Sequence, residues 1–169
     1  MSANLSISTA ADSQVIIRGS NWRDLNPVRN LEQRCFPKDF WPLWDIIGVL
    51  TMPNIVRLKA VAGDEIVGFI AGELHSGDQI AWISTVGVLP EYRGRGIGTS
   101  LMKACEERLS AQAVRLSVRK SNLDAIRLYN KLGYSPVESW NRYYQDGEDA
   151  LVLEKILANQ SGMQNAEKR

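Results

Sequence analysis

Hydrophobic and polar positions recur along the chain with two different periods, and these periods predict its helices and strands. Apolar residues three or four positions apart are typical of helices, whereas short aliphatic runs bounded by Gly, Pro, Asn or Asp are typical of strands. The expected helices are 22–35, 43–50, 97–109 and 122–132. The expected strands are 15–18, 55–62, 66–74, 80–89, 114–118, a segment from Tyr134 onward, and 150–157.

The resulting order, β-α-α-β-β-β-α-β-α-β-β, predicts an α/β fold with a mixed central sheet flanked by helices on both faces. Gly63-Asp64 joins two of the strand-like runs at a spacing typical of a hairpin. We expect one domain over residues 14–157, a disordered polar tail over 1–13 and a loose polar tail over 158–169.

A glycine-rich segment, Arg93-Gly94-Arg95-Gly96-Ile97-Gly98, joins the strand 80–89 directly to a helix. Alternating glycines allow a tight turn and a close approach of a ligand to the backbone, and the first N–H groups of the helix carry partial positive charge. This arrangement predicts a cradle for a phosphate or pyrophosphate group. A Walker loop is excluded because no Gly-Lys-Ser/Thr follows, and the spacing of the glycines excludes the dinucleotide fingerprint.

The composition narrows the class of protein and its partners. The chain has 169 residues and a net charge of +1, which gives no electrostatic reason to expect nucleic acid or an anionic membrane as a partner. Cys35 and Cys105 are far apart and lack metal-ligand spacing, so we expect buried free thiols and no metal. The N-terminus has no signal-peptide pattern, and no apolar run is long enough to span a membrane. We therefore expect a cytoplasmic protein.

Two motifs together resemble the GNAT acyltransferases, which bind acetyl-coenzyme A. The first is Arg93-x-x-Gly96-x-Gly98 after a strand, and the second is the run 121–134, SNLDAIRLYNKLGY. The resemblance covers roughly residues 15–157 and implies the GNAT fold, with acetyl-CoA as co-substrate. In that family an Asn at a helix start meets the pantetheine arm or the pyrophosphate, and a Tyr one to two turns later faces the thioester sulfur. Asn122 and Tyr129 match these positions, and Tyr129 would protonate the departing thiolate.

The resemblance also implies how acetyl-CoA is held. The strand 80–89 should separate from its neighbour after Val86-Gly87-Val88, so that its backbone groups pair with the pantetheine amides and polarise the thioester carbonyl. Besides Asn122 and Tyr129, the residues expected to bind acetyl-CoA are Val86, Gly87, Val88, Arg93, Gly94, Arg95, Gly96, Ile97, Gly98 and Thr99.

Two further segments resemble protein N-terminal acetyltransferases, both the ribosomal-protein alanine type and the eukaryotic N-terminal-methionine type. They are Cys35-Phe36-Pro37-Lys38-Asp39-Phe40 and Asn141-Arg142-Tyr143-Tyr144, which flank the acceptor groove in those enzymes. The resemblance implies a protein or peptide N-terminus as acceptor. The residues expected to bind it are Phe36, Pro37, Lys38, Phe40, Tyr143 and Tyr144. Because Lys38 stands where one branch carries Glu, we expect a preference for acidic residues near the substrate terminus.

The positions at which these relatives carry a general base hold other residues here. Ser117 stands where the ribosomal enzyme has Glu and some relatives have His, and Trp82 stands where others have Tyr. Near the end of the strand 66–74, Glu73 is a catalytic candidate and His75 a weaker one. We expect water to relay the proton from the substrate amine, since an α-amino group with a pKa of about 7.7–8.0 is partly neutral at physiological pH.

Two other functions remain open. One is a GNAT enzyme that acetylates a small amine, such as a polyamine or an aminoglycoside. That reaction needs acidic residues in a closed pocket, and the Tyr143-Tyr144 pair favours a peptide instead. The other is a non-catalytic acyl-CoA-binding module, against which the presence of Tyr129 argues. The sequence is compatible with a monomer or a homodimer.

Overall fold

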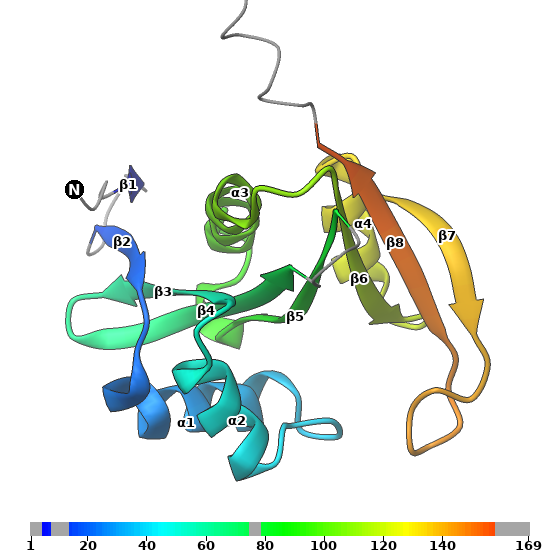
Figure 1. Cartoon of the computed structure of the whole chain (residues 1–169). Helices are drawn as coiled ribbons and strands as arrows, with labels where there is room; N and C mark the ends of the chain where they lie inside the picture. The colour runs from blue at the N-terminus through cyan, green and yellow to red at the C-terminus, as the bar shows by residue number, and fades with distance from the viewer. Residues whose placement is uncertain (1–4, 8–13, 75–78, 158–169) are drawn as a thin grey trace, which may run out of the picture.

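The computed structural model describes residues 5–7, 14–74 and 79–157, whose strands form one eight-stranded sheet (Figure 1). The strand order is β1-β2-β3-β4-β5-β6-β8-β7, and every neighbouring pair is antiparallel apart from the parallel pair β5 and β6. The strands are β1 Leu5–Ile7, β2 Val15–Gly19, β3 Ile55–Ala62, β4 Glu65–Leu74, β5 Ile80–Val88, β6 Ala113–Arg119, β7 Ser135–Trp140 and β8 Ala150–Ile156. The predicted mixed sheet is confirmed.

Helices cover both faces of this sheet. The α-helices of the described residues are α1 Leu25–Cys35, α2 Leu43–Thr51, α3 Ile97–Leu109 and α4 Leu123–Lys131, and two 3-10 turns are η1 Trp22–Asp24 and η2 Pro90–Tyr92. In Figure 1, α1 and α2 lie against one face and α3 lies against the other. The helix α1 packs on β4 and β5, and α3 packs on β3, β4 and β5, so the predicted α/β class is confirmed. Within the described ranges, no helix is long and apolar enough to cross a membrane.

Two glycines of β4 let α3 approach the sheet closely. A Cβ at Gly68 would lie 2.9 Å from Leu101 Cδ1, and a Cβ at Gly72 would lie 3.3 Å from Leu109 Cδ1, both side chains of α3. Leu101 is completely buried at this contact, and burial of such a side chain stabilises a fold by about 1.5–3 kcal/mol. Because side chains alternate along a strand, Gly68 and Gly72 face α3 while Ala71 faces α1.

Two boundaries near the N-terminus differ from the sequence expectation. Leu5–Ile7, inside the expected tail, pairs with β2 as strand β1. The first long helix begins at Leu25 because Asn21 caps the separate turn η1, its side chain accepting a hydrogen bond of 2.9 Å from the Arg23 N–H. The other residues of both expected tails, including 158–169, lie outside the described residues.

Candidate active site

Strand β5 separates from its parallel neighbour β6 near the middle of the sheet. The two strands pair only over Ile80–Trp82 of β5, whereas β5 stays paired with β4 as far as Val88. Figure 1 shows the two strands diverging. The separation begins earlier than the predicted point after Val86-Gly87-Val88, because a shift in register leaves Ser84 as an extra residue and such a bulge bends the strand. The second half of β5 therefore presents backbone groups that β6 does not pair.

The glycine loop lies at the carboxyl end of β5, where η2 leads into α3. Gly94 and Gly96 have φ angles of +73° and +79°, which glycine adopts without strain, and a Cβ at Gly96 would meet no protein atom within 4 Å. The helical hydrogen bonds at the start of α3 begin with the Ser100 N–H, which donates to the Gly96 carbonyl at 3.0 Å. The N–H groups that precede it in α3 therefore have no partner within the helix. An anion beside Gly96 would meet these groups and the positive end of the helix dipole. A Cβ at Gly98 would lie 3.4 Å from Leu128 Cδ2, so the start of α3 packs against α4.

The two arginines of this loop hold the turn itself. Arg93 Nε donates to the Val88 carbonyl at 3.0 Å, and Arg95 Nη2 donates to the Glu91 carbonyl at 3.1 Å. Arg95 also lies over the Tyr92 ring, with its guanidinium carbon 5.0 Å from the ring centre. Both guanidinium groups thus remain beside the loop and add positive charge to that of the α3 N-terminus.

Asn122 and Tyr129 lie at the start and near the end of α4. Asn122 is the helix cap, its Oδ1 accepting a hydrogen bond of 3.2 Å from the Ala125 N–H. Tyr129 is 7% exposed, and its ring contacts the edge of Tyr134 with the ring centres 6.0 Å apart. Burial, together with the nearby Tyr144 hydroxyl, raises the pKa of Tyr129 above its usual range. This hydroxyl keeps its proton at physiological pH and is suited to donating it.

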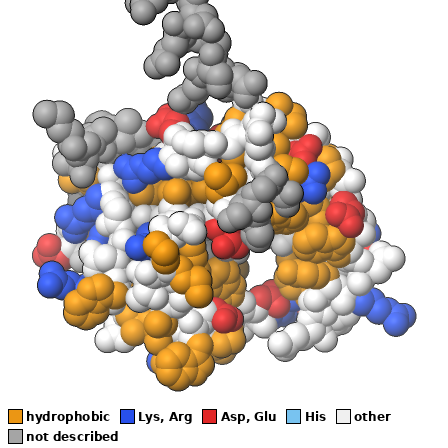
Figure 2. Space-filling view, in the orientation of Figure 1, with side chains coloured by type: hydrophobic (Ala, Val, Ile, Leu, Met, Phe, Trp, Pro, Cys, Tyr) orange, Lys and Arg blue, Asp and Glu red, His pale blue; other side chains and the backbone are white. Residues whose placement is uncertain are grey.

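The two predicted acceptor segments flank the separated half of β5. Phe36 follows α1, and a Cβ at Gly87 would lie 3.2 Å from both Phe36 Cε2 and Cys35 Sγ, so Gly87 makes room for the end of α1. Tyr143 and Tyr144 lie between β7 and β8, with ring centres 5.1 Å apart. Burial raises the pKa of Tyr144 to about 12. Figure 2 shows an opening between the half of the molecule that carries α1 and α2 and the half that carries β7 and β8.

Arg119, at the end of β6, joins these two segments. Its guanidinium donates two hydrogen bonds of 2.6 and 2.7 Å to Asp39, in the connection between α1 and α2. It also bonds Asp146 at 3.0 Å and Glu148 at 2.7 Å, both between β7 and β8. The guanidinium carbon lies 3.9 Å from the centre of the Tyr144 ring. We call Arg119 with its three carboxylates the arginine clamp, and sequence reasoning did not find it.

Aromatic rings continue from β5 to the β7–β8 connection. Trp82 stacks on Trp140 with ring centres 5.8 Å apart and an angle of 19° between the planes. Trp140 in turn contacts Tyr143, with ring centres 5.1 Å apart. These rings form an apolar wall that begins at the residue of β5 where the separation from β6 starts.

Comparison with known proteins agrees with this geometry. Residues 25–134, more than half of the chain, match the family described as acetyltransferase (GNAT) family. The chain belongs to the GNAT acetyltransferase family. The protein is therefore an acetyl-CoA-dependent N-acetyltransferase.

Similar proteins narrow the resemblance. An N-alpha-acetyltransferase of Sulfolobus acidocaldarius is 40% identical over 151 residues, which are 81% of this chain and 89% of the relative. The catalytic subunit NAA10 of the N-terminal acetyltransferase A complex of Arabidopsis thaliana is 30% identical, over 89% of this chain and 81% of the relative. The solved structure of Arabidopsis thaliana Naa50 in complex with the bisubstrate analogue CoA-Ac-MVNAL has a TM-score of 0.75 and 28% identity, covering 85% of this chain and 99% of that chain.

Among the described residues, Glu73 is the candidate for a general base in this acetyltransferase, and it lies near the start of the strand separation. Glu73 of β4 is half-buried, lies directly opposite Trp82, and is on the face of the sheet that α1 covers. Ser117 lies opposite Val152 in the pairing of β6 with β8. His75 lies outside the described residues. The structure thus brings Glu73 and Trp82 together.

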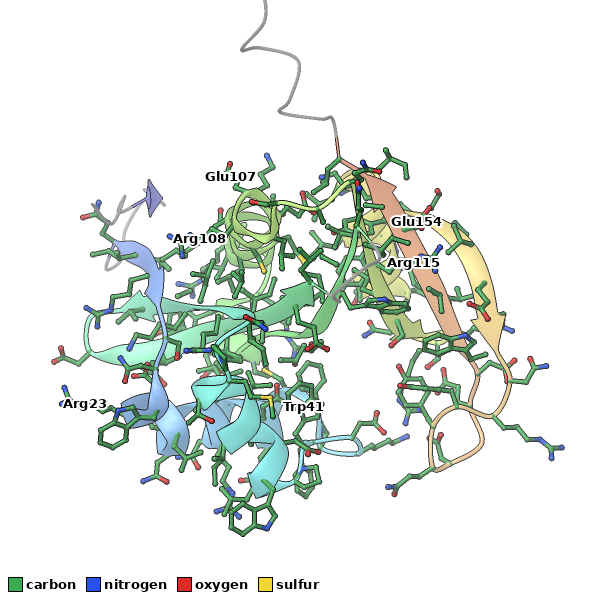
Figure 3. All side chains as sticks on the ribbon, in the orientation of Figure 1. Arg23, Trp41, Glu107, Arg108, Arg115 and Glu154 are labelled. Carbon is green, nitrogen blue, oxygen red and sulfur yellow. The ribbon has the colours of Figure 1, made fainter. Side chains whose placement is uncertain are left out.

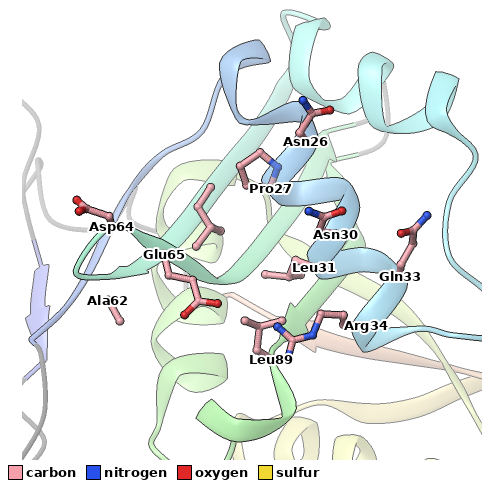
Figure 4. A pocket seen from close by; sticks show the side chains of 11 residues that line it. Asn26, Pro27, Asn30, Leu31, Gln33, Arg34, Ala62, Asp64, Glu65 and Leu89 are labelled. Carbon is pink, nitrogen blue, oxygen red and sulfur yellow. The ribbon is translucent and has the colours of Figure 1, made fainter.

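A separate cavity of about 840 Å³ lies between α1 and the β3–β4 turn (Figure 4). Its lining combines apolar side chains with polar ones, which include Asn26, Asn30, Arg34, Asp64 and Glu65. Among the described residues, none of those predicted to bind acetyl-CoA or the acceptor lines this cavity. It is therefore distinct from the site built around the glycine loop.

Proposed function

We propose that this N-acetyltransferase transfers the acetyl group of acetyl-CoA to the α-amino group of a protein or peptide N-terminus. The observation that carries the proposal is the arginine clamp, which holds the two acceptor segments together beside the separated half of β5. The glycine loop and the buried Tyr129 lie on the other elements that border this strand. The Sulfolobus acidocaldarius relative is named an N-alpha-acetyltransferase, and the Arabidopsis thaliana relative is named the catalytic subunit of an N-terminal acetyltransferase complex; both names support the same acceptor.

The residues present fit acetyl-CoA as co-substrate. The open space at Gly96 and the N–H groups at the start of α3 suit its pyrophosphate. The backbone of Val86–Val88, which β6 does not pair, suits the pantetheine amides. Asn122 is exposed at the start of α4 and is proposed to contact the same arm.

Gly96→Glu is expected to abolish stabilisation of the fold by acetyl-CoA. A ligand that binds only the folded state stabilises it by about 2.7 kcal/mol at a hundredfold excess over its Kd. Glu at this position would place bulk and negative charge where the pyrophosphate is proposed to lie. Gly63→Glu is the matched control, because Gly63 also has a positive φ of 59° and open space around its Cβ, but lies in the β3–β4 turn. Thermal unfolding with and without acetyl-CoA gives the measurement. A wild-type protein without a shift, or a Gly96→Glu variant with the wild-type shift, would contradict this cofactor site.

The proposed reaction is direct attack of the amine on the thioester. A backbone N–H of the separated half of β5 would polarise the thioester carbonyl and stabilise the oxyanion that forms. Tyr129 would give its proton to the departing thiolate as the general acid. Its burial beside Tyr144 of an acceptor segment supports this role, because both substrates must meet there.

The chemistry of proton removal favours an α-amino group over a lysine side chain. With no Glu, His or Tyr at position 117 or 82, the site lacks the bases that relatives use. An α-amino group has a pKa of about 7.7–8.0, whereas a lysine amine, near 10.4, is far less often neutral at physiological pH. We propose that the proton leaves through a relay, with Glu73 beside Trp82 as the alternative acceptor.

The charges around the opening bear on the choice of acceptor. Asp39, Asp146 and Glu148 are all bonded to Arg119, so they are not available to bind a polyamine, and this favours a peptide over a small amine. The pKa of Asp146 is lowered chiefly by its hydrogen bond with Arg119 and also by the nearby Lys38 ammonium. Lys38 thus lies near the rim of the opening, where we propose that it favours acidic residues close to the substrate terminus.

Mass spectrometry of a panel of acceptors tests the proposal. Peptides with a free N-terminus should be acetylated faster than spermidine or an aminoglycoside, and those with an acidic residue near the terminus should be the better acceptors by a few-fold, as for an exposed ion pair. Faster acetylation of the small amines would favour the second candidate function. A cytoplasmic location is part of the proposal, supported by the free thiols of Cys35 and Cys105.

A further inference from the structure

Helix α1 carries a carboxylate on the face that packs against the sheet. Glu32 is 1% exposed, and its Oε1 accepts a hydrogen bond of 2.7 Å from Thr85 Oγ1 of β5. Its Oε2 is also buried, and no described residue offers it a hydrogen bond. Buried polar atoms are normally paired, because the charged form of a carboxylate is costly to remove from water. Burial accordingly raises the pKa of Glu32, so this carboxylate gains a proton more readily than an ordinary glutamate.

Thr85 connects Glu32 to the acceptor side of the sheet. It lies in the half of β5 that has separated from β6, and it pairs with Ala71 of β4. Gly87, two residues further along the same strand, contacts Phe36, so Thr85 faces the side on which the acceptor segment lies. The Thr85 hydroxyl donates its own proton to Glu32, which leaves its oxygen lone pairs able to accept one.

Few other charges surround Glu32. The elements that pack against α1 are η1, α2, β4 and β5, and the buried side chains of α2 and β4 on that side are apolar. Exposed charged side chains on α1 and these elements are Arg23, Arg29, Arg34, Asp45 and Glu65. The other titratable or charged side chains on or beside them are Asp24, Cys35, Lys59, Glu73 and Arg93. Asp24 is bonded to Lys59 at 2.6 Å, and the Arg93 guanidinium lies against the Cys35 thiol. Burial and the Thr85 hydroxyl therefore dominate the ionisation of Glu32.

We propose that Glu32 is the final acceptor of the proton lost by the substrate amine, and that Thr85 passes the proton to it. This inference rests on the proposed N-terminal acetylation and gives the expected relay an end point inside the protein. Glu32 acts through Thr85 and does not itself touch the substrate. Glu32 thus serves as the proton acceptor, a role that relatives assign to a base at the positions of Ser117 and Trp82.

The proton transfer balances without a further reactant. The neutral amine attacks the thioester, which leaves a positive charge on the nitrogen of the tetrahedral intermediate. One N–H bond of this nitrogen breaks, its electron pair stays on nitrogen, and the proton bonds to Thr85 Oγ1 as the Thr85 hydroxyl proton moves to Glu32 Oε1. Thr85 ends unchanged, Glu32 becomes neutral, and the nitrogen becomes the neutral amide nitrogen of the product as the thiolate leaves. Tyr129 supplies a separate proton to the thiolate. When the product has left, Glu32 returns its proton to water by the reverse path through Thr85.

The pH dependence of a Glu32→Gln variant tests this relay. Gln keeps the size of the side chain and accepts the Thr85 hydrogen bond through its amide oxygen, but it does not take up a proton. In the wild type, kcat/KM for a peptide requires a neutral α-amino group and an ionised Glu32, whereas the variant requires only the former. We expect a loss of roughly 10²-fold in kcat/KM at about pH 8. Below the pKa of Glu32 the ratio of wild type to variant should fall about tenfold per pH unit.

Substitutions at Thr85 provide an independent measurement. Thr85→Val removes the hydroxyl at nearly constant shape and should flatten the pH dependence as Glu32→Gln does. Thr85→Ser restores the hydroxyl and should keep the wild-type pH dependence. The matched charge control is Glu107→Gln, an exposed carboxylate on α3 (Figure 3), which should leave kcat/KM unchanged at every pH.

A ratio of wild type to Glu32→Gln that is the same at every pH would overturn the relay, because a purely structural role predicts that result. If Glu32→Gln does not fold, the Thr85→Val and Thr85→Ser pair decides by the same criterion. Failure of the wild type to acetylate any peptide N-terminus would overturn the proposed function and the relay together. An active wild type with a pH-independent ratio would overturn the relay alone.

Discussion

Tyr129→Phe is expected to lower kcat by about 10²–10⁴-fold, the usual loss when a general acid is removed. Phe keeps the ring and its edge contact with Tyr134, so the change removes little besides the hydroxyl proton. Burial raises the pKa of Tyr129, and it acts in the same direction on the thiol of a leaving group in the same region, which keeps proton donation feasible. Steady-state kinetics with a peptide acceptor at saturating acetyl-CoA give the measurement.

Two further measurements on the Tyr129→Phe variant separate catalysis from folding. Its thermal unfolding temperature and the shift that acetyl-CoA produces should stay close to those of the wild type, because neither depends on the hydroxyl proton. Turnover within a few-fold of the wild type would show that another group protonates the thiolate, and the role of Tyr129 would then be reduced to packing.

Arg119→Gln is expected to lower kcat/KM for the peptide by about 10- to 100-fold, mainly through KM. A hydrogen bond to a charged group contributes about 1.5–3 kcal/mol, and about 1.4 kcal/mol corresponds to a factor of ten. The variant would also leave Asp39, Asp146 and Glu148 close together without their cation, and their repulsion would move the two acceptor segments apart. The shift in unfolding temperature with acetyl-CoA should persist, because the clamp lies outside the glycine loop.

Arg115→Gln is the matched control for the clamp. Arg115 lies four residues earlier on the same strand and forms an ion pair of 2.6 Å with Glu154 (Figure 3), but it bonds neither acceptor segment. It should change KM for the peptide much less than Arg119→Gln does. Equal effects of the two substitutions on KM would contradict a role of the clamp in acceptor binding and would point to a general loss of stability. Arg119→Lys should recover part of the loss, because Lys keeps the charge but not the two parallel hydrogen bonds to Asp39.

Local patterns were sufficient to predict the elements that carry the site. The hairpin around Gly63-Asp64 and the turn from β5 into α3 both depend on glycines with positive φ angles, and that requirement is visible in the sequence. The caps of α4 follow from Asn122 and Gly133 in the same way. These features lie within a few residues of one another, so no long-range contact is needed to infer them.

The remaining features of the site depend on contacts between distant residues. Arg119 meets Asp39 across 80 residues and Glu148 across 29, and neither pair has a local signature. The point at which β5 leaves β6 depends on the bulge at Ser84, which only the register of three strands reveals. Glu32 did have a local signal, because it lies four residues after Val28 and thus on the apolar face of α1.

The central claim is that the acceptor is the α-amino group of a protein or peptide, and matched peptides with free and blocked N-termini test it most directly. Each peptide carries one internal lysine, and tandem mass spectrometry after incubation with acetyl-CoA locates the acetyl group. The arrangement of β5, Tyr129 and the arginine clamp predicts acetylation of the free α-amino group and no modification of the blocked peptide. Acetylation of the lysine in the blocked peptide, with the free N-terminus left unmodified, would contradict it.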